Sequence, residues 1–131
     1  MTGLVDTSVI ARYLTGDPPD LADRAAAILD GEEELQVTDV AIAETAYVLT
    51  SVYGVARQEV VDSLVELLQK ENLQPFRLDK AIVIEALLLC RRSGRVSFAD
   101  ALIWAAARSG GADRIYTFDG RFPTTGVELS G

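Results

Sequence analysis

Short apolar segments of strand length alternate along this chain with longer segments that have helical periodicity. Strands are expected at residues 3–5, 35–37, 73–76, 114–117 and 126–129. Helices are expected over residues 7–14, 20–29, 38–53, 57–70, 79–92 and 97–109. The apolar stripe of residues 57–70 is the clearest amphipathic pattern, and Pro75 restricts the third strand to a sheet edge. The alternation predicts an α/β sandwich with a mainly parallel sheet.

Length and composition indicate one domain over residues 1–131 and exclude several classes of protein. No apolar run reaches the roughly 18 residues that a membrane-spanning helix needs. Cys90 is the only cysteine, which excludes an internal disulfide and a thiolate zinc site, and we expect it to be inert core. The first residues lack the features of a signal peptide. We therefore expect a cytoplasmic protein that does not bind membranes.

Four acidic residues stand among apolar neighbours. They are Asp6 after the first strand, Glu44 on the third helix, Asp100 at the start of the last helix and Asp119 after the fourth strand. Burying a carboxylate is costly unless a positive charge compensates it. Because the chain has no histidine, four such acids indicate a hard cation with oxygen ligands, Mg²⁺ or Mn²⁺. Such a site suits hydrolysis of a phosphodiester by an activated water.

Each acid also has a structural interpretation to be weighed. Asp6 can cap a helix, Asp119-Gly120 is typical of a turn, and Asp100 can complete a capping box that Ser97 begins. If the fourth strand extended through Asp119, that side chain would point to the same side as Thr117.

Glu44 is the hardest of the four to explain structurally, since its helical neighbours predict a buried face: they are Val40, Ala41, Tyr47 and Val48. Asp100 is likewise predicted on a buried face, beside Val96, Ile103 and Trp104.

The chain resembles the PIN-domain ribonucleases over essentially its full length. The resemblance lies in Val5-Asp6-Thr7-Ser8, in Glu44, in Phe98-Ala99-Asp100-Ala101-Leu102 and in Thr117-Phe118-Asp119. Its length is similar to that of the VapC-type toxins of toxin–antitoxin pairs. The resemblance implies a PIN-like three-layer sandwich, with a central, mainly parallel sheet of four or five strands flanked by helices.

The resemblance also implies an activity, a set of site residues and partners. The activity is Mg²⁺- or Mn²⁺-dependent cleavage of RNA, with Asp6, Glu44, Asp100 and Asp119 as metal ligands and catalytic residues. In the family, the position that corresponds to Asp119 often acts on the metal through a water molecule. Thr7, Ser8 and Thr117 are candidate supporting hydroxyls. The implied partners are a second copy of the chain, in a homodimer, and a VapB-type antitoxin.

Five arginines are candidates for contact with RNA phosphates. They are Arg12, Arg91, Arg92, Arg95 and Arg121. Arg91 and Arg92 also suit the solvated C-terminal end of a helix, where the helix dipole favours positive charge. The net charge of −8 argues against broad, non-specific binding of nucleic acid, but bound cations would offset the four site acids.

Three other functions compete with a toxin ribonuclease. A housekeeping PIN-type nuclease in RNA processing would carry the same residues, and the neighbouring gene would distinguish it. A receiver domain would need a second acid after the first strand and a late lysine, but no lysine follows Lys80. A non-catalytic, partner-binding domain would not need the intact acidic set.

Overall fold

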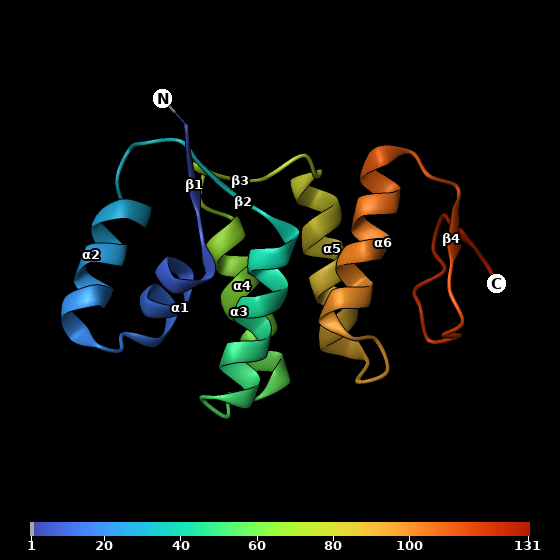
Figure 1. Ribbon diagram of the computed structural model, residues 1–131, viewed down its shortest axis with the longest axis horizontal. Coiled ribbons are helices and arrows are strands. Elements are labelled where there is room, and N and C mark those ends of the chain that lie inside the picture. The colour runs from blue at the N-terminus through green and yellow to red at the C-terminus, as the bar shows by residue number, and fades with distance from the viewer. Residues whose placement is uncertain (1) are drawn as a thin grey trace. The chain divides into compact units, whose positions relative to one another are not determined.

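Six helices and five short strands make up residues 2–131, the part of the chain that the computed structural model describes (Figure 1). In chain order they are β1 (Gly3–Val5), α1 (Thr7–Thr15), α2 (Pro19–Leu29), β2 (Leu35–Val37), α3 (Asp39–Ser51), α4 (Arg57–Leu68), β3 (Leu73–Pro75), α5 (Lys80–Arg92), α6 (Phe98–Gly110), β4 (Arg114–Tyr116) and β5 (Glu128–Ser130). Their contacts divide the chain into two compact units, one ending at Phe76 and the other running from Arg77 to Gly131.

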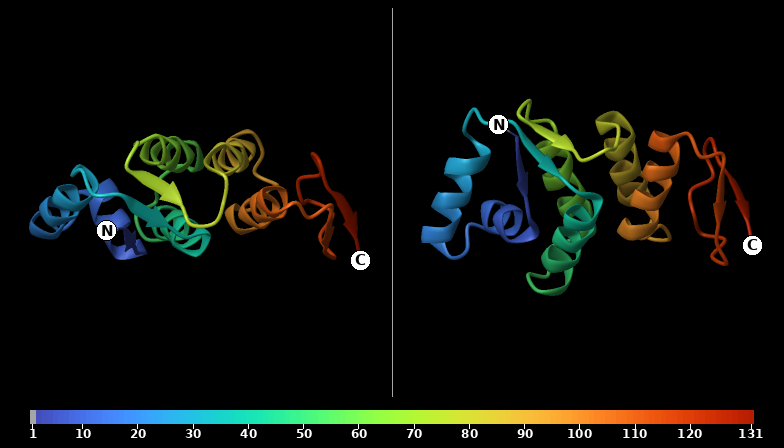
Figure 2. Two further views of the ribbon diagram at one scale, coloured as in Figure 1. Left: turned by 90° about the horizontal axis from the view of Figure 1, so that it is seen from above. Right: turned by 45° about the horizontal axis from the view of Figure 1, so that its top comes forward.

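The first unit is built on a parallel sheet with the strand order β1-β2-β3. Val5 lies opposite Val37, which lies opposite Pro75, and all three side chains are buried. Helix α1 packs against α2 and α3, and α4 packs against α3 and β3 (Figure 2). Strand β3 pairs only with β2 within the described sheet, so Pro75 lies at an edge as predicted.

Three polar side chains contact one another at the surface of the first unit. They come from α1, from the C-terminal end of α2 and from the segment after α4. The carboxylate oxygen Oδ1 of Asp30 accepts hydrogen bonds of 2.6 Å from the Tyr13 hydroxyl and from Lys70 Nζ. The Lys70 ammonium also lies 5.5 Å from the centre of the Tyr13 ring. The three groups tie separate parts of this unit together at its surface.

The second unit consists of the packed helices α5 and α6 and the parallel pair β4 and β5. Cys90 of α5 is fully buried, as expected of a core cysteine. Trp104 of α6 is also fully buried, and its indole nitrogen donates a hydrogen bond of 3.0 Å to the carbonyl oxygen of Thr125. This bond fastens the segment between β4 and β5 to α6.

The predicted α/β class with parallel strands is confirmed, and the starts of four helices lie where the sequence places a capping side chain. The N-caps of α1, α3, α5 and α6 are Asp6, Thr38, Asp79 and Ser97. The five strands form one three-stranded and one two-stranded sheet. No helix among residues 2–131 is both long enough and apolar enough to cross a membrane.

Replacing Trp104 with phenylalanine tests the bond between α6 and the following segment. Trp104→Phe keeps a buried ring but leaves the Thr125 carbonyl without its donor, so we expect the free energy of unfolding to fall by about 1–3 kcal/mol. Denaturant unfolding followed by circular dichroism measures the change. Ile103→Ala, at the adjacent half-exposed position, should change it by only about 0.5 kcal/mol. Equal effects of the two substitutions would contradict this role of Trp104.

Candidate active site

Asp6 caps helix α1 and is exposed to solvent. Its Oδ1 atom accepts hydrogen bonds from the backbone nitrogens of Ser8 (3.1 Å) and Val9 (3.3 Å) and from the Ser8 hydroxyl (2.6 Å). The Ser8 hydroxyl is the largest cause that lowers the pKa of Asp6, and the two backbone donors add to it. The structural interpretation of Asp6 as a helix cap is therefore confirmed, and its other carboxylate oxygen, Oδ2, takes no part in the cap.

Glu44 lies in the middle of α3 on a face that is open to solvent, so the prediction of a buried face was wrong. Val40 is 71% exposed and Tyr47 is 65% exposed, and Glu44 itself is exposed. The buried side of α3 carries instead Ala41, Ile42, Thr45, Ala46 and Leu49. Because α3 is apolar nearly all round, its periodicity does not distinguish the two sides. The Glu44 carboxylate forms no hydrogen bond or ion pair with residues 2–131.

Asp100 stands in the first turn of α6, where its backbone nitrogen donates a hydrogen bond of 3.0 Å to the Ser97 hydroxyl oxygen. This bond is the one that the Ser97 side chain contributes to the predicted capping box. Trp104 and Val96 are buried as expected, whereas Ile103 is 50% exposed because it lies on the outer side of the helix. Asp100 is half-buried and lies between the buried side of α6 and its exposed side.

Asp119 forms a two-pronged ion pair with Arg121. The Arg121 Nε and Nη2 atoms lie 3.0 and 3.1 Å from Oδ1 and Oδ2 of Asp119, and the Arg121 backbone nitrogen donates to Oδ1 at 2.9 Å. The backbone nitrogen of Asp119 donates to the Thr117 hydroxyl oxygen at 3.0 Å. Strand β4 ends at Tyr116, so the turn interpretation is correct and the strand does not extend through Asp119.

Within the second unit the charge of Arg95 acts on Asp119, and the charges of Asp119 and Asp100 act on Arg121. The bond from the Arg121 guanidinium is the largest cause that lowers the pKa of Asp119, and the charge of Arg95 adds a smaller effect. The pKa of Arg121 is raised chiefly by Asp119 and further by the charge of Asp100. The second unit therefore places two of the predicted acids near two of the predicted arginines.

A family profile of the PIN domain matches residues 3–128, which include all four acids and most of each unit. The chain belongs to the PIN domain family. PIN domains are generally metal-dependent nucleases, so the match indicates a hydrolase of the PIN nuclease superfamily. No curated protein matches the chain.

The hydroxyls predicted to support the site and the arginines predicted to contact phosphate differ in the groups that surround them. Ser8 and Thr117 bond to Asp6 and Asp119, while Thr7 forms no side-chain hydrogen bond within residues 2–131. Arg91 and Arg92 are exposed in the last turn of α5, where the helix dipole favours them.

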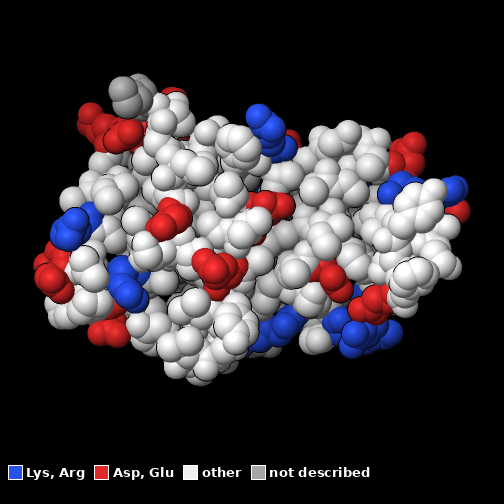
Figure 3. Space-filling model, in the orientation of Figure 1, with Lys and Arg blue, Asp and Glu red and all other residues white. Residues whose placement is uncertain are grey.

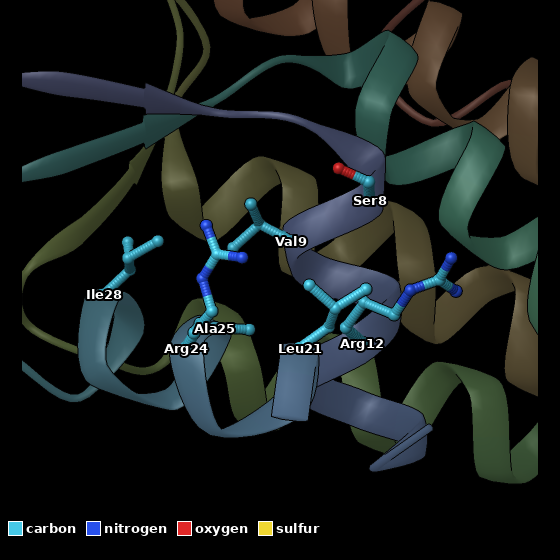
Figure 4. Close-up of a pocket in the computed structure, with 7 residues that line it drawn as sticks. All are labelled: Ser8, Val9, Arg12, Leu21, Arg24, Ala25 and Ile28. Carbon is cyan, nitrogen blue, oxygen red and sulfur yellow. The ribbon is translucent and has the colours of Figure 1, made fainter. Parts of the chain in front are cut away.

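Arg12 lines a cavity between α1 and α2 (Figure 4). The cavity has a volume of about 230 Å³ and is otherwise mostly apolar, and the guanidinium of Arg24 also faces it. Arg24 was not predicted to line a cavity, because nothing in its local pattern separates it from an ordinary solvated residue on a helix.

The donor chemistry of the acids fits a hard divalent cation, although the described part of the chain shows no preformed cluster. Several acidic side chains on the face seen in Figure 3 are surrounded by uncharged surface. Residues 2–131 contain no group of three or more His, Cys, Asp or Glu side chains placed to hold a metal ion. The carboxylate oxygens of Asp6, Glu44, Asp100 and Asp119 are nevertheless the ligand type that Mg²⁺ and Mn²⁺ prefer.

Removing the guanidinium of Arg121 tests the charge pair at Asp119. In Arg121→Gln we expect the pKa of Asp119 to rise from its lowered value toward its ordinary range, measured by NMR titration of the carboxylate carbon. Because the folded-state pKa is lowered, the pair stabilises the native protein at neutral pH, and this contribution is lost as the pH falls through that pKa.

The matched control for this titration is Arg114→Gln, which removes an arginine that pairs with Glu128 in the same unit. We expect it to leave the pKa of Asp119 unchanged. An Asp119 pKa that is the same in the wild type and in Arg121→Gln would show that the ion pair does not form in solution.

Proposed function

We propose that this PIN domain is a Mg²⁺- or Mn²⁺-dependent endoribonuclease and the toxin of a type II toxin–antitoxin pair. Asp6, Glu44, Asp100 and Asp119 are its proposed metal ligands and catalytic residues. The observation that carries the proposal is the PIN domain match over residues 3–128, which contains each of these carboxylates. The toxin role, the homodimer and the VapB-type antitoxin rest on the resemblance of the sequence motifs to VapC-type toxins.

A bound divalent cation would supply an activated water and neutralise charge on the phosphoryl oxygens. The protein side of this chemistry begins with Asp6, which its three hydrogen bonds hold in one orientation and keep ionised at neutral pH. Glu44 and Asp100 add carboxylates that form no ion pair within the described residues. These three acids are the stronger candidates for direct ligands.

Asp119 is better suited to an indirect role, because both of its oxygens are engaged by Arg121. A carboxylate that accepts two hydrogen bonds from one guanidinium can still accept a further hydrogen bond from a water molecule. Arg121 itself has the planar donor arrangement that binds phosphate in two places, and Arg95 lies close enough to influence Asp119. Arg95 and Arg121 are therefore the preferred candidates for contact with the RNA backbone.

The direct test is cleavage of end-labelled, structured RNA by the purified protein, freed of any antitoxin, in Mg²⁺ or Mn²⁺. We expect discrete products that disappear with a chelator. Asp100→Asn should reduce the rate by at least about 100-fold, more than the loss of a supporting residue around a metal. Asp113→Asn, which removes an exposed acid of the same unit, should cleave like the wild type.

Cleavage that survives Asp100→Asn unchanged would contradict the assignment of Asp100. Failure of the wild type to cleave any tested RNA, together with failure to bind Mn²⁺, would contradict the nuclease itself. It would favour a partner-binding domain that has kept the fold.

The toxin role is tested separately, by induced expression in bacterial cells. We expect the wild type to arrest growth and Asp100→Asn to leave growth normal at the same level of folded protein. Co-expression of a small antitoxin encoded beside it should restore growth. Normal growth with a wild type that cleaves RNA in vitro would favour a housekeeping nuclease.

A further inference from the structure

Two aromatic side chains of the second unit stand in solvent beside a candidate catalytic residue. Tyr116, at the end of β4, is 76% exposed, and Phe118, in the turn that follows, is 99% exposed. The interior of the unit is filled by other residues, among them Trp104, Ile115 and Phe122. Single exposed apolar residues are common on proteins, but two large aromatic side chains exposed within three residues, beside a candidate catalytic carboxylate, are a candidate binding surface.

Phe118 stands at a small, open hollow with a mixed polar and apolar lining. Phe118 lines a cavity of about 310 Å³ together with Thr117, Asp119, Leu129 and Ser130. Pockets for small organic groups begin at about 300 Å³. The hollow therefore suits one planar group resting against the ring.

An arginine flanks the aromatic pair on each side in the sequence, and each of the two arginines is paired with an acid. The Arg114 guanidinium lies 6.0 Å from the centre of the Tyr116 ring, and Arg121 is held on Asp119. Exposed aromatic rings alternating with arginines are the features with which proteins bind single-stranded nucleic acid: the rings stack on bases and the cations hold the backbone. Here both features lie within residues 114–121, next to one proposed catalytic carboxylate.

We infer that Tyr116 and Phe118 form a stacking platform for an unpaired base of the RNA substrate. The inference rests on the proposed ribonuclease function and deepens it, because it makes the substrate single-stranded at the position that Asp119 flanks. Stacking tolerates any base, since every base has a flat face. The platform would therefore select unpaired RNA over duplex without fixing a sequence.

An introduced tryptophan at position 118 reports stacking directly. Trp104 is the only tryptophan and is fully buried, so Phe118→Trp adds a single exposed indole whose fluorescence a stacked base quenches. The probe is an unstructured RNA of twelve nucleotides in Mg²⁺, with Asp100→Asn present so that the RNA is not consumed. We expect saturable quenching, and none in the control Val52→Trp, which places the indole at an exposed position at the C-cap of α3.

Binding affinity provides the second measurement, by fluorescence anisotropy of labelled RNA with the same inactive protein. Phe118→Ala should weaken binding on the order of tenfold, whereas Phe118→Tyr should retain it and Phe118→Leu should not. Val52→Ala should leave the affinity unchanged. The substituted side chains at 118 and 52 are exposed, and circular dichroism confirms that each variant is folded.

Three outcomes would overturn the inference, and they are distinguishable. If RNA binds equally well to Phe118→Ala and the introduced indole is not quenched, the platform is wrong while the ribonuclease proposal stands. If Phe118→Ala leaves RNA affinity unchanged but abolishes self-association in sedimentation, the aromatic pair is a protein interface. If the wild type neither binds nor cleaves RNA, the inference fails together with the proposed function.

Discussion

The hydrogen bonds that start the helices place three of the four candidate acids. At α1 the carboxylate of Asp6 is itself the cap, accepting bonds from two backbone nitrogens. At α6 the Ser97 hydroxyl oxygen accepts the bond from the Asp100 nitrogen, which puts Asp100 in the first turn. At α3 the Thr38 hydroxyl oxygen accepts from Ala41, and Glu44 follows on the second turn. Losing a cap would therefore misplace the carboxylate as well as fray the helix.

The four acids are tolerated because solvent or a partner compensates them, and not because a cation neutralises buried charge. Asp6 and Glu44 are exposed, Asp100 is half-buried, and Asp119 is paired with Arg121. Apolar neighbours did not imply burial for Glu44, since Val40 and Tyr47 beside it are exposed too. The oxygen-only donor set and membership of the PIN family, and not burial, are therefore what favour a divalent metal.

Local features of the fold were predictable from the sequence, whereas features that depend on packing were not. The caps at Asp6 and Ser97, the edge position of Pro75 and the turn at Asp119 follow from chemistry within a few residues. The exposed side of α3 could not be identified, because that helix is apolar nearly all round. The exposure of Phe118 could not be predicted either, since an aromatic residue after a strand usually packs inward.

Binding of Mn²⁺ to Asp6→Asn, measured by electron paramagnetic resonance, tests the central claim most directly. Asparagine caps a helix about as well as aspartate, so the substitution removes the charge of the carboxylate while keeping α1. We predict an unchanged thermal unfolding midpoint and an Mn²⁺ affinity at least about tenfold below that of the wild type. Asp20→Asn, at an exposed acid on α2, should bind like the wild type. Equal Mn²⁺ affinity of Asp6→Asn and the wild type would contradict the account.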